Sequence, residues 1–169
     1  MTDSTSTEPG APPRAASPCS IRQARQADVT SFAAAVGELL EELGGSCPEP
    51  AALEAEVGAQ LDDPSVAMLL VAEADGEIVG VLAASWVRAI HVPGRYGVIQ
   101  DLWVRRDWRS RAIGAELVAA LAELAGEQGV ARIEVGLPRE SFAAIEATTA
   151  FYARNGFEPL GPRMRRLLP

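Results

Sequence analysis

The stretch RRDWRSRAIG, residues 105–114, places four arginines just before and within a small-residue turn that leads into an apolar helical pattern. The N-terminus of a helix presents unpaired N–H groups and about half a positive charge. An arginine guanidinium adds a planar donor fork that fits phosphate oxygens, and small residues let the backbone approach a ligand closely. A strand, a tight loop and a helix in this order therefore predict a site for a small anion.

Carboxylates in two apolar, strand-like segments are candidates for proton transfer. In RIEVGL, strand alternation places Glu134 on the face opposite Ile133 and Val135, which suits a carboxylate in a cleft. In GVIQDLWV, the same alternation places Gln100 and Asp101 on opposite faces. Such an acid can accept a proton from a substrate, and the competing interpretation is a solvated or structural carboxylate.

Composition excludes several classes of protein. The 169-residue chain has a formal net charge of -8, which argues against a general nucleic-acid binder because basic residues supply most non-specific affinity for phosphates. No apolar run approaches the roughly 18 residues of a membrane span, so no membrane association is expected. One histidine, His91, and two cysteines, Cys19 and Cys47, are too few for a metal site or a disulfide framework. Reduced thiols in the cytoplasm are the expected state.

The sequence divides into a tail and one domain. Residues 1–19 are rich in Ser, Thr, Pro and Ala and lack a basic start and an apolar segment, so a disordered tail is predicted instead of a secretory signal. Residues 20–169 contain no linker or internal repeat, which predicts a single domain.

The positioning elements alternate between helical and strand patterns. Helical spacing of apolar residues, with Asp28 as a cap and Gly44 as a stop, predicts the first helix. The helices are expected at residues 28–43, 50–61, 113–128 and 141–154. Strands are expected near residue 21 and at 66–73, 77–90, 97–104 and 132–137, with a loop at 91–97 and a short final strand or pair at 157–160 and 162–168. This order predicts a sheet covered by helices on both faces.

Two motifs in this frame resemble those of the GNAT family of N-acetyltransferases. RSRAIG resembles the family's diphosphate loop, (Q/R)-x-x-G-x-(G/A), with Arg109 first and Gly114 last. Ala112 stands where the family usually has glycine, and Ser110 where a second glycine is common. Because the loop enters a helix at this point, we expect a negative φ at Ala112.

The second motif, TTAFYARNGF, is similar to the family's F-Y-x-x-x-G-F at the end of the last helix. Phe151, Tyr152, Gly156 and Phe157 all match, whereas Ile145 stands where the family often has asparagine. The two motifs lie about 40 residues apart, and the resemblance covers roughly residues 20–167. Their order and spacing make the pair more specific than either motif alone.

The resemblance implies a mixed α/β (α+β) fold. Its central sheet is mostly antiparallel, has six to seven strands, and splays between the fourth and fifth strands, with helices on both faces. It also implies direct transfer of an acetyl group from acetyl-CoA, a co-substrate, to a primary amine, most readily that of a small molecule. The alternatives are a protein N-terminal or lysine acetyltransferase and an acyl-CoA-binding module with little catalysis. Members of the family often dimerise, so the resemblance allows a homodimer.

Roles for individual residues follow from the same resemblance. Coenzyme contacts are expected from the end of the fourth predicted strand, which would pair with pantetheine, and from the backbone of the loop: Leu102, Trp103, Val104, Arg109, Ser110, Arg111, Ala112, Ile113 and Gly114. Tyr152 is the expected acid for the leaving thiolate. Glu134 is the expected base, acting through water, with Asp101 as the alternative, and Gln100 replaces a glutamate that polyamine acetyltransferases use. Acceptor contacts are expected from Trp86, Tyr96 and Asp101, and no metal is expected.

Overall fold

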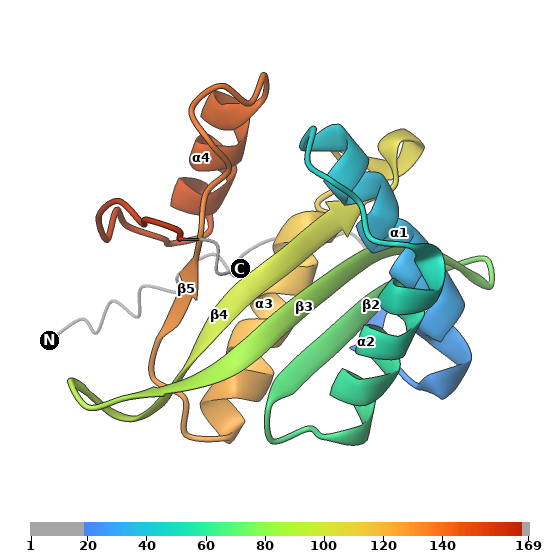
Figure 1. Ribbon diagram of the computed structural model, residues 1–169. Coiled ribbons are helices and arrows are strands. Elements are labelled where there is room, and N and C mark those ends of the chain that lie inside the picture. Colours follow the sequence, from blue (N-terminus) through green and yellow to red (C-terminus); the bar gives the residue numbers. More distant parts are fainter. Residues whose placement is uncertain (1–18, 167–169) are drawn as a thin grey trace, which may run out of the picture.

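The computed structural model describes residues 19–166 and contains one five-stranded sheet (Figure 1). The strands lie in chain order, and every neighbouring pair is antiparallel except the last, which is parallel. They are β1 (Ser20–Gln23), β2 (Ala67–Ala74), β3 (Glu77–Ala89), β4 (Val92–Val104) and β5 (Ile133–Val135). The mixed, mostly antiparallel sheet is confirmed, with five strands over the described range instead of six to seven.

Helices cover both faces of the sheet, as predicted (Figure 1). The helices α1 (Val29–Glu42) and α2 (Pro50–Asp62) pack on one face, and α3 (Ile113–Glu127) packs on the other. The last helix, α4 (Ile145–Arg154), follows β5 and contributes Tyr152 to the α3 side. Among residues 19–166, no helix combines the length and the apolar composition needed to cross a membrane.

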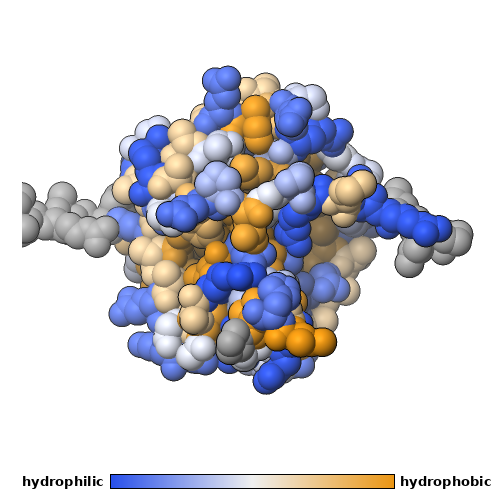
Figure 2. All heavy atoms as spheres, turned by 90° about the vertical axis from the view of Figure 1, so that its left-hand side faces the viewer, coloured by the Kyte–Doolittle hydropathy of each residue, from blue (hydrophilic) through white to orange (hydrophobic). Residues whose placement is uncertain are grey.

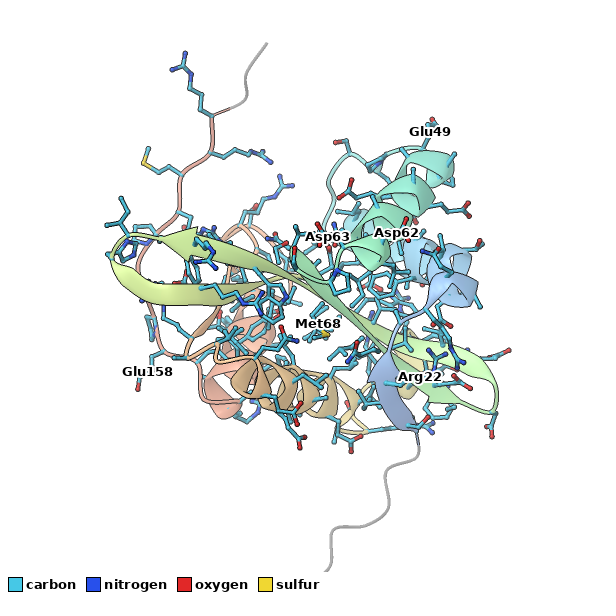
Figure 3. The ribbon with its side chains drawn as sticks, turned by 90° about the horizontal axis from the view of Figure 1, so that it is seen from below. Arg22, Glu49, Asp62, Asp63, Met68 and Glu158 are labelled. Atoms are coloured by element: carbon cyan, nitrogen blue, oxygen red, sulfur yellow. The ribbon has the colours of Figure 1, made fainter. Side chains whose placement is uncertain are left out.

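Strand alternation divides the core into two layers. On β2, Met68 and Leu70 point toward α3, while Leu69 and Val71 point toward α1 and α2. Figure 3 shows Met68 between the sheet and α3. Because β2 is buried on both faces, its sequence reads as a continuous apolar run instead of an alternating one.

A β-bulge in β4 changes which residues face each layer. Asp101 pairs with Ala83 and Ile99 pairs with Ala84, so Gln100 is the extra residue between them. Without the bulge, strict alternation from Ile99 would turn Asp101 toward α3. With it, Asp101 lies on the α1–α2 face, beside its partner Ala83. Bulges commonly re-aim side chains next to active sites.

The sheet opens between β4 and β5. Their pairing covers only Gly97–Ile99 against Ile133–Val135. Beyond it, residues 100–104 of β4 pair with β3 alone, while the chain leaving β5 runs away toward α4 (Figure 1). The predicted splay between the fourth and fifth strands is therefore confirmed.

Several predicted boundaries were wrong near prolines. The segment 91–97, expected as a loop, is mostly strand. Arg88 pairs with Arg95 and Ala89 with Val92, so a register shift leaves Pro93 and Gly94 without pairing partners on β3. The φ of Gly94 is +82°. The last helix begins at Ile145 instead of 141, after turns that follow Pro138.

The end of the chain also differs from the prediction. No strand forms at 157–160 or 162–166, where Pro159 and Pro162 lack the N–H groups that a ladder needs. The fifth strand is shorter than the predicted 132–137. Residues 167–168 of the expected final strand, and residues 1–18 of the expected tail, lie outside the described range.

Candidate functional site

The loop between β4 and α3 has two residues with left-handed backbone. The φ angles are +62° at Ser110 and +65° at Ala112, and Ala112 is the N-cap residue of α3. The expected negative φ at Ala112 was therefore wrong. A left-handed conformation costs a non-glycine residue roughly 1–2 kcal/mol. The GNAT motif favours glycine at both positions. The loop therefore has the left-handed conformation without glycine, the residue that adopts it most easily.

The backbone of this loop fits an anion. The N–H groups of Ser110, Arg111 and Ala112 donate no hydrogen bond to any residue of the described part of the chain. The first N–H groups of α3 follow directly, and its ladder begins with the Glu116 N–H donating to the Ala112 carbonyl at 3.0 Å. Successive N–H groups in such a turn form a concave anion site, which matches the oxygens of a diphosphate.

The arginine side chains around the loop are largely engaged within the protein. Arg109 donates to both carboxylate oxygens of Glu42, at 2.7 and 2.9 Å, and to the Val104 carbonyl at 2.9 Å. Arg105 pairs with Glu77 at 2.7 Å and with Asp107 at 2.9 Å. The cluster is therefore not an open cationic patch, and the backbone N–H groups are the donors that remain for an anion.

Trp108 and Glu42 complete the loop's surroundings. The guanidinium groups of Arg105 and Arg111 lie 5.7 and 4.7 Å from the Trp108 ring centroid. Glu42, at the end of α1, was not singled out as a partner of the loop. It lies 67 residues from Arg109 in sequence, so no local spacing connects the two.

The two sequence motifs meet in space at Gly114. A Cβ atom on Gly114 would lie 3.3 Å from the Phe151 ring, so glycine lets α3 and α4 approach closely. Figure 2 shows the side of the molecule that carries α4 and β5, where apolar residues reach the surface between polar ones. The exposed leucines include Leu137 after β5 and Leu160 after α4. Apolar surface therefore remains uncovered near the splay.

Tyr152 lies buried in the last turn of α4. It is 8% exposed, and its ring stacks edge-on against Phe151 and Phe157, with centroids 5.1 and 5.3 Å away. Burial, and secondly the charge of Asp101, raise the pKa of Tyr152 to about 12. The phenol is therefore neutral at ordinary pH and can donate a proton or a hydrogen bond.

Asp101 lies on the other side of the opening, at the bulge of β4. Loss of solvent raises the pKa of its carboxyl group above the ordinary value. No hydrogen bond or ion pair joins this carboxylate to another of residues 19–166. It lines a cavity of about 220 Å³ between the sheet and the helices α1 and α2. A carboxylate with a raised pKa and no protein partner can bind an ammonium group and accept its proton.

Glu134, the base expected from the sequence, is placed differently. It pairs with Val98 on the α1–α2 face, and its Oε1 lies 2.5 Å from a terminal nitrogen of Arg132. The Arg132 guanidinium also lies 5.1 Å from the Tyr96 ring centroid. The carboxylate of Glu134 is thus held by a cation, unlike that of Asp101.

The expected acceptor residues are not gathered in one place. Trp86 packs on the α3 side, with Arg95 above its ring at 5.4 Å, whereas Tyr96 and Asp101 lie on the α1–α2 face. Of the expected coenzyme contacts on β4, Trp103 is buried toward α1, and Leu102 and Val104 pack toward α3. The sequence analysis did not identify the cavity. Its walls come from two helices and three strands, and the periodicity within each element does not show how these elements lie relative to one another.

The site lacks a recognisable metal centre. In the part of the chain from 19 to 166, no group of three or more His, Cys, Asp or Glu side chains is arranged to hold a metal ion.

Comparison of the sequence with protein families gives one match. The model of the acetyltransferase (GNAT) family matches residues 34–157, which is most of the chain and includes both motifs. A comparison with curated proteins gives no significant match.

Comparison with solved structures shows the same fold at low identity. A possible acetyltransferase from Clostridium difficile has a TM-score of 0.76 and 18% identity, covering 89% of this chain and 98% of that chain. A ribosomal-protein-alanine N-acetyltransferase from Brucella melitensis has a TM-score of 0.70 and 19% identity, over 89% and 99%. An aminoglycoside acetyltransferase from an uncultured soil metagenomic sample has a TM-score of 0.72 and 22% identity, over 89% and 99%.

Proposed function

Because the chain belongs to the acetyltransferase (GNAT) family, we propose that it is an acetyl-CoA-dependent N-acetyltransferase that moves the acetyl group directly to a primary amine of a small molecule. The observation that carries the proposal is that the charge of Asp101 acts on Tyr152. One is an unpartnered carboxylate with a raised pKa, and the other is a buried phenol that feels its charge. They flank the opening between β4 and β5, beside a loop whose N–H groups suit a diphosphate.

Two parts of the coenzyme, the diphosphate and the pantetheine, would find suitable backbone groups in this chain. The backbone N–H groups of residues 109–114 would bind the diphosphate. The edge of β4 at residues 102–104 faces the opening without a β5 partner, so it would pair with pantetheine as with an added strand. Acetyl-CoA bound there supplies an activated thioester beside Tyr152.

Asp101 and Tyr152 would divide the proton transfers. Asp101 takes one proton from the ammonium group, and the free amine then forms the new N–C bond as the C–S bond breaks. Tyr152 gives its proton to the leaving sulfur. The second proton of the amide nitrogen restores the phenol, and Asp101 returns the first proton to solvent.

The two steps support each other electrostatically. The negative charge of Asp101 contributes to the raised pKa of Tyr152. When Asp101 accepts a proton, that contribution disappears and the pKa of Tyr152 falls. The phenol thus becomes the stronger acid at the stage when the thiolate needs a proton.

Acetylation of a protein N-terminus or lysine remains the second candidate, favoured by Glu134. Its carboxylate lies on the same face as Asp101 and would act through water. The contact with Arg132 reduces its availability, so we assign it the secondary role. The Brucella structure is described as an enzyme for a ribosomal protein's alanine and the metagenomic one as an aminoglycoside enzyme, so the fold serves both kinds of acceptor.

We further propose a cytoplasmic location and no nucleic-acid partner. A content of two cysteines suits a reducing compartment, and the chain is acidic. A homodimer is the assembly that the family allows.

Calorimetric titration with acetyl-CoA, followed by thiol release in the presence of an amine panel, tests the function. We expect saturable binding and amine-dependent release. An adenine nucleotide without phosphopantetheine serves as the control and should bind more weakly. Failure to bind acetyl-CoA would contradict the proposal, and binding without release for any amine or peptide would indicate an acyl-CoA-binding module.

A further inference from the structure

The cavity beside Asp101 has mostly apolar walls. It measures about 220 Å³ and lies between α1, α2 and strands β2, β3 and β4. Its apolar lining comes mainly from the two helices and β2: Phe32, Val36, Leu40, Leu53, Val57 and Leu69. Phe32, Val57 and Leu69 are buried, and Leu40 and Leu53 are half-buried. The walls therefore offer contacts to hydrocarbon and few to polar groups.

Polar groups occur at two ends of this cavity. Asp101 belongs to the sheet end, next to Ala83, and no described residue neutralises its carboxylate. Glu56 and Gln60 belong to the α2 side, where Glu56 is exposed, and the Gln60 side-chain N–H donates to the Glu56 carboxylate at 2.9 Å. The buried end is thus anionic, and the solvent end is already hydrogen-bonded within α2.

We infer that the acceptor is a small monoamine with an apolar chain, whose ammonium group binds Asp101 and whose chain lies among the side chains of α1 and α2. This inference rests on the proposed acetyltransferase function and specifies its substrate class. At the buried end one carboxylate, that of Asp101, can compensate one ammonium group, and the apolar walls compensate none. The carboxylate of Glu56 is exposed at the solvent end, where water screens its attraction for a second charge. Asp101 is also the group whose charge acts on Tyr152, the proposed acid of the transfer.

The size of the cavity supports the same class. Sites for drug-sized ligands measure roughly 300–1,000 Å³, so a cavity of about 220 Å³ suits a smaller molecule. An aminoglycoside would exceed it and would bring several ammonium groups against leucine and valine side chains. A polyamine would fit in width, but its inner charge would lose water without gaining a partner.

A matched pair of ligands tests the inference. Pentylamine and cadaverine have the same five-carbon chain and differ by one terminal ammonium group. Calorimetric titration of the full chain in the presence of CoA should give pentylamine an affinity at least about tenfold higher. Affinity should also rise roughly fourfold for each methylene from propylamine to pentylamine. Equal or tighter binding of cadaverine, or no dependence on chain length, would overturn the inference.

Two substitutions on α2 locate the binding site. Leu53 and Leu61 both pack toward the second core layer, but only Leu53 lines the cavity. Leu53→Ala should weaken pentylamine binding by about tenfold, and Leu61→Ala by less than about twofold. Equal effects of the two variants would place the ligand elsewhere. Neither leucine belongs to the proposed coenzyme site. The affinity for acetyl-CoA should therefore stay unchanged in both variants, which would show that the fold is intact.

Turnover separates this inference from the function on which it rests. Thiol release that is faster with cadaverine or an aminoglycoside than with pentylamine would overturn the monoamine assignment and leave the acetyltransferase intact. The absence of release with every amine would contradict the acetyltransferase, and the binding titrations would still decide what the cavity takes.

Discussion

Asp28 and Asp101 are two aspartates withdrawn from solvent in different regions of the same fold. Asp28, at the start of α1, is 7% exposed, accepts two bonds from Arg22 at 2.7 and 2.9 Å, and accepts one from the Arg25 N–H at 2.8 Å. Asp101, at the bulge of β4, is half-buried and has no hydrogen-bond or ion-pair partner among residues 19–166. The pKa of Asp28 is lowered, chiefly by Arg22, and that of Asp101 is raised by burial.

The opposite pKa shifts of Asp28 and Asp101 show how a structural carboxylate can be distinguished from a candidate functional one. Burial raises the pKa of both groups, but three hydrogen bonds reverse the shift at Asp28. Arg22, which Figure 3 labels on β1, also bonds to Glu73, so this network ties β1 and β2 to the start of α1. An acid with all its partners inside the protein stabilises the fold, whereas an acid without them remains available to a substrate.

The largest effect is expected at Tyr152, the proposed acid whose pKa responds to the charge of Asp101. Tyr152→Phe removes the acid and should lower kcat by roughly 10²–10⁴-fold, the range for general acid catalysis. Thiol release under saturating acetyl-CoA measures it, with the unfolding midpoint and acetyl-CoA affinity as controls. A variant with more than half of the original kcat would show that another group protonates the sulfur.

The next effect comes from Asp101 itself. Asp101→Asn should lower kcat/KM by about 100-fold, equivalent to about 2.7 kcal/mol. The wild-type rate should fall as the pH decreases through the raised pKa of Asp101, and this limb should vanish in the variant. Since a raised pKa means that the ionised acid costs folding energy at neutral pH, the stability of Asp101→Asn should be unchanged or higher.

Glu134→Gln is the comparison for that experiment. It should leave most of the activity, because the carboxylate of Glu134 is already held by Arg132. The opposite result would be a fall of the rate at low pH that disappears in Glu134→Gln and persists in Asp101→Asn. Glu134 would then be the base, and the raised pKa of Asp101 would not indicate a catalytic role.

The opposite pattern is expected at Asp28. Asp28→Asn should lower the free energy of unfolding by about 2 kcal/mol at neutral pH, a typical value for hydrogen bonds to a charged group. The lowered pKa stabilises the fold above the ordinary value of 3.8, and this contribution is lost as the pH falls through the folded-state pKa. Urea unfolding at pH 7 and pH 3 measures it. A deficit that is equally large at both would contradict the ionic explanation.

The smallest effect concerns strain in the anion loop. Ala112→Gly should raise the free energy of unfolding by about 1 kcal/mol, because glycine adopts a φ of +65° without penalty. Ala119→Gly, the same change at an exposed position inside α3, should lower it by about 1 kcal/mol. If both variants lose stability, the loop at Ala112 is not strained.

Much of the fold was predictable from local patterns. Helical spacing located α1, α2 and α3 to within a few residues, and the turn at Asp75 and Gly76 indicated the hairpin of β2 and β3. The errors cluster where prolines and register shifts determine the backbone, as at Pro93 and Pro159, because a shift depends on the partner strand and not on the local sequence.

The candidate site was predictable in part. Motif spacing singled out the loop before α3 and Tyr152, and the structure brings their helices together where Gly114 meets Phe151. The roles of these residues stay predictions. The surroundings of the two carboxylates were predictable to different degrees. Strand alternation places Arg132 on the same face as Glu134, so that contact could be read from the sequence. The face of Asp101 depends on the bulge in β4, so the lack of a cation beside it within residues 19–166 required the coordinates.

The single extra residue in β4 affects how relatives of this chain are aligned. Gln100 and Asp101 exchange faces if one residue is gained or lost between Ile99 and Leu102. A gap of one position in an alignment would therefore pair Asp101, which lines the cavity between the sheet and the helices α1 and α2, with a residue that does not line it. Relatives with an acid in this strand should be matched by the position of their bulge, and the acid that follows the bulge is the one to compare with Asp101.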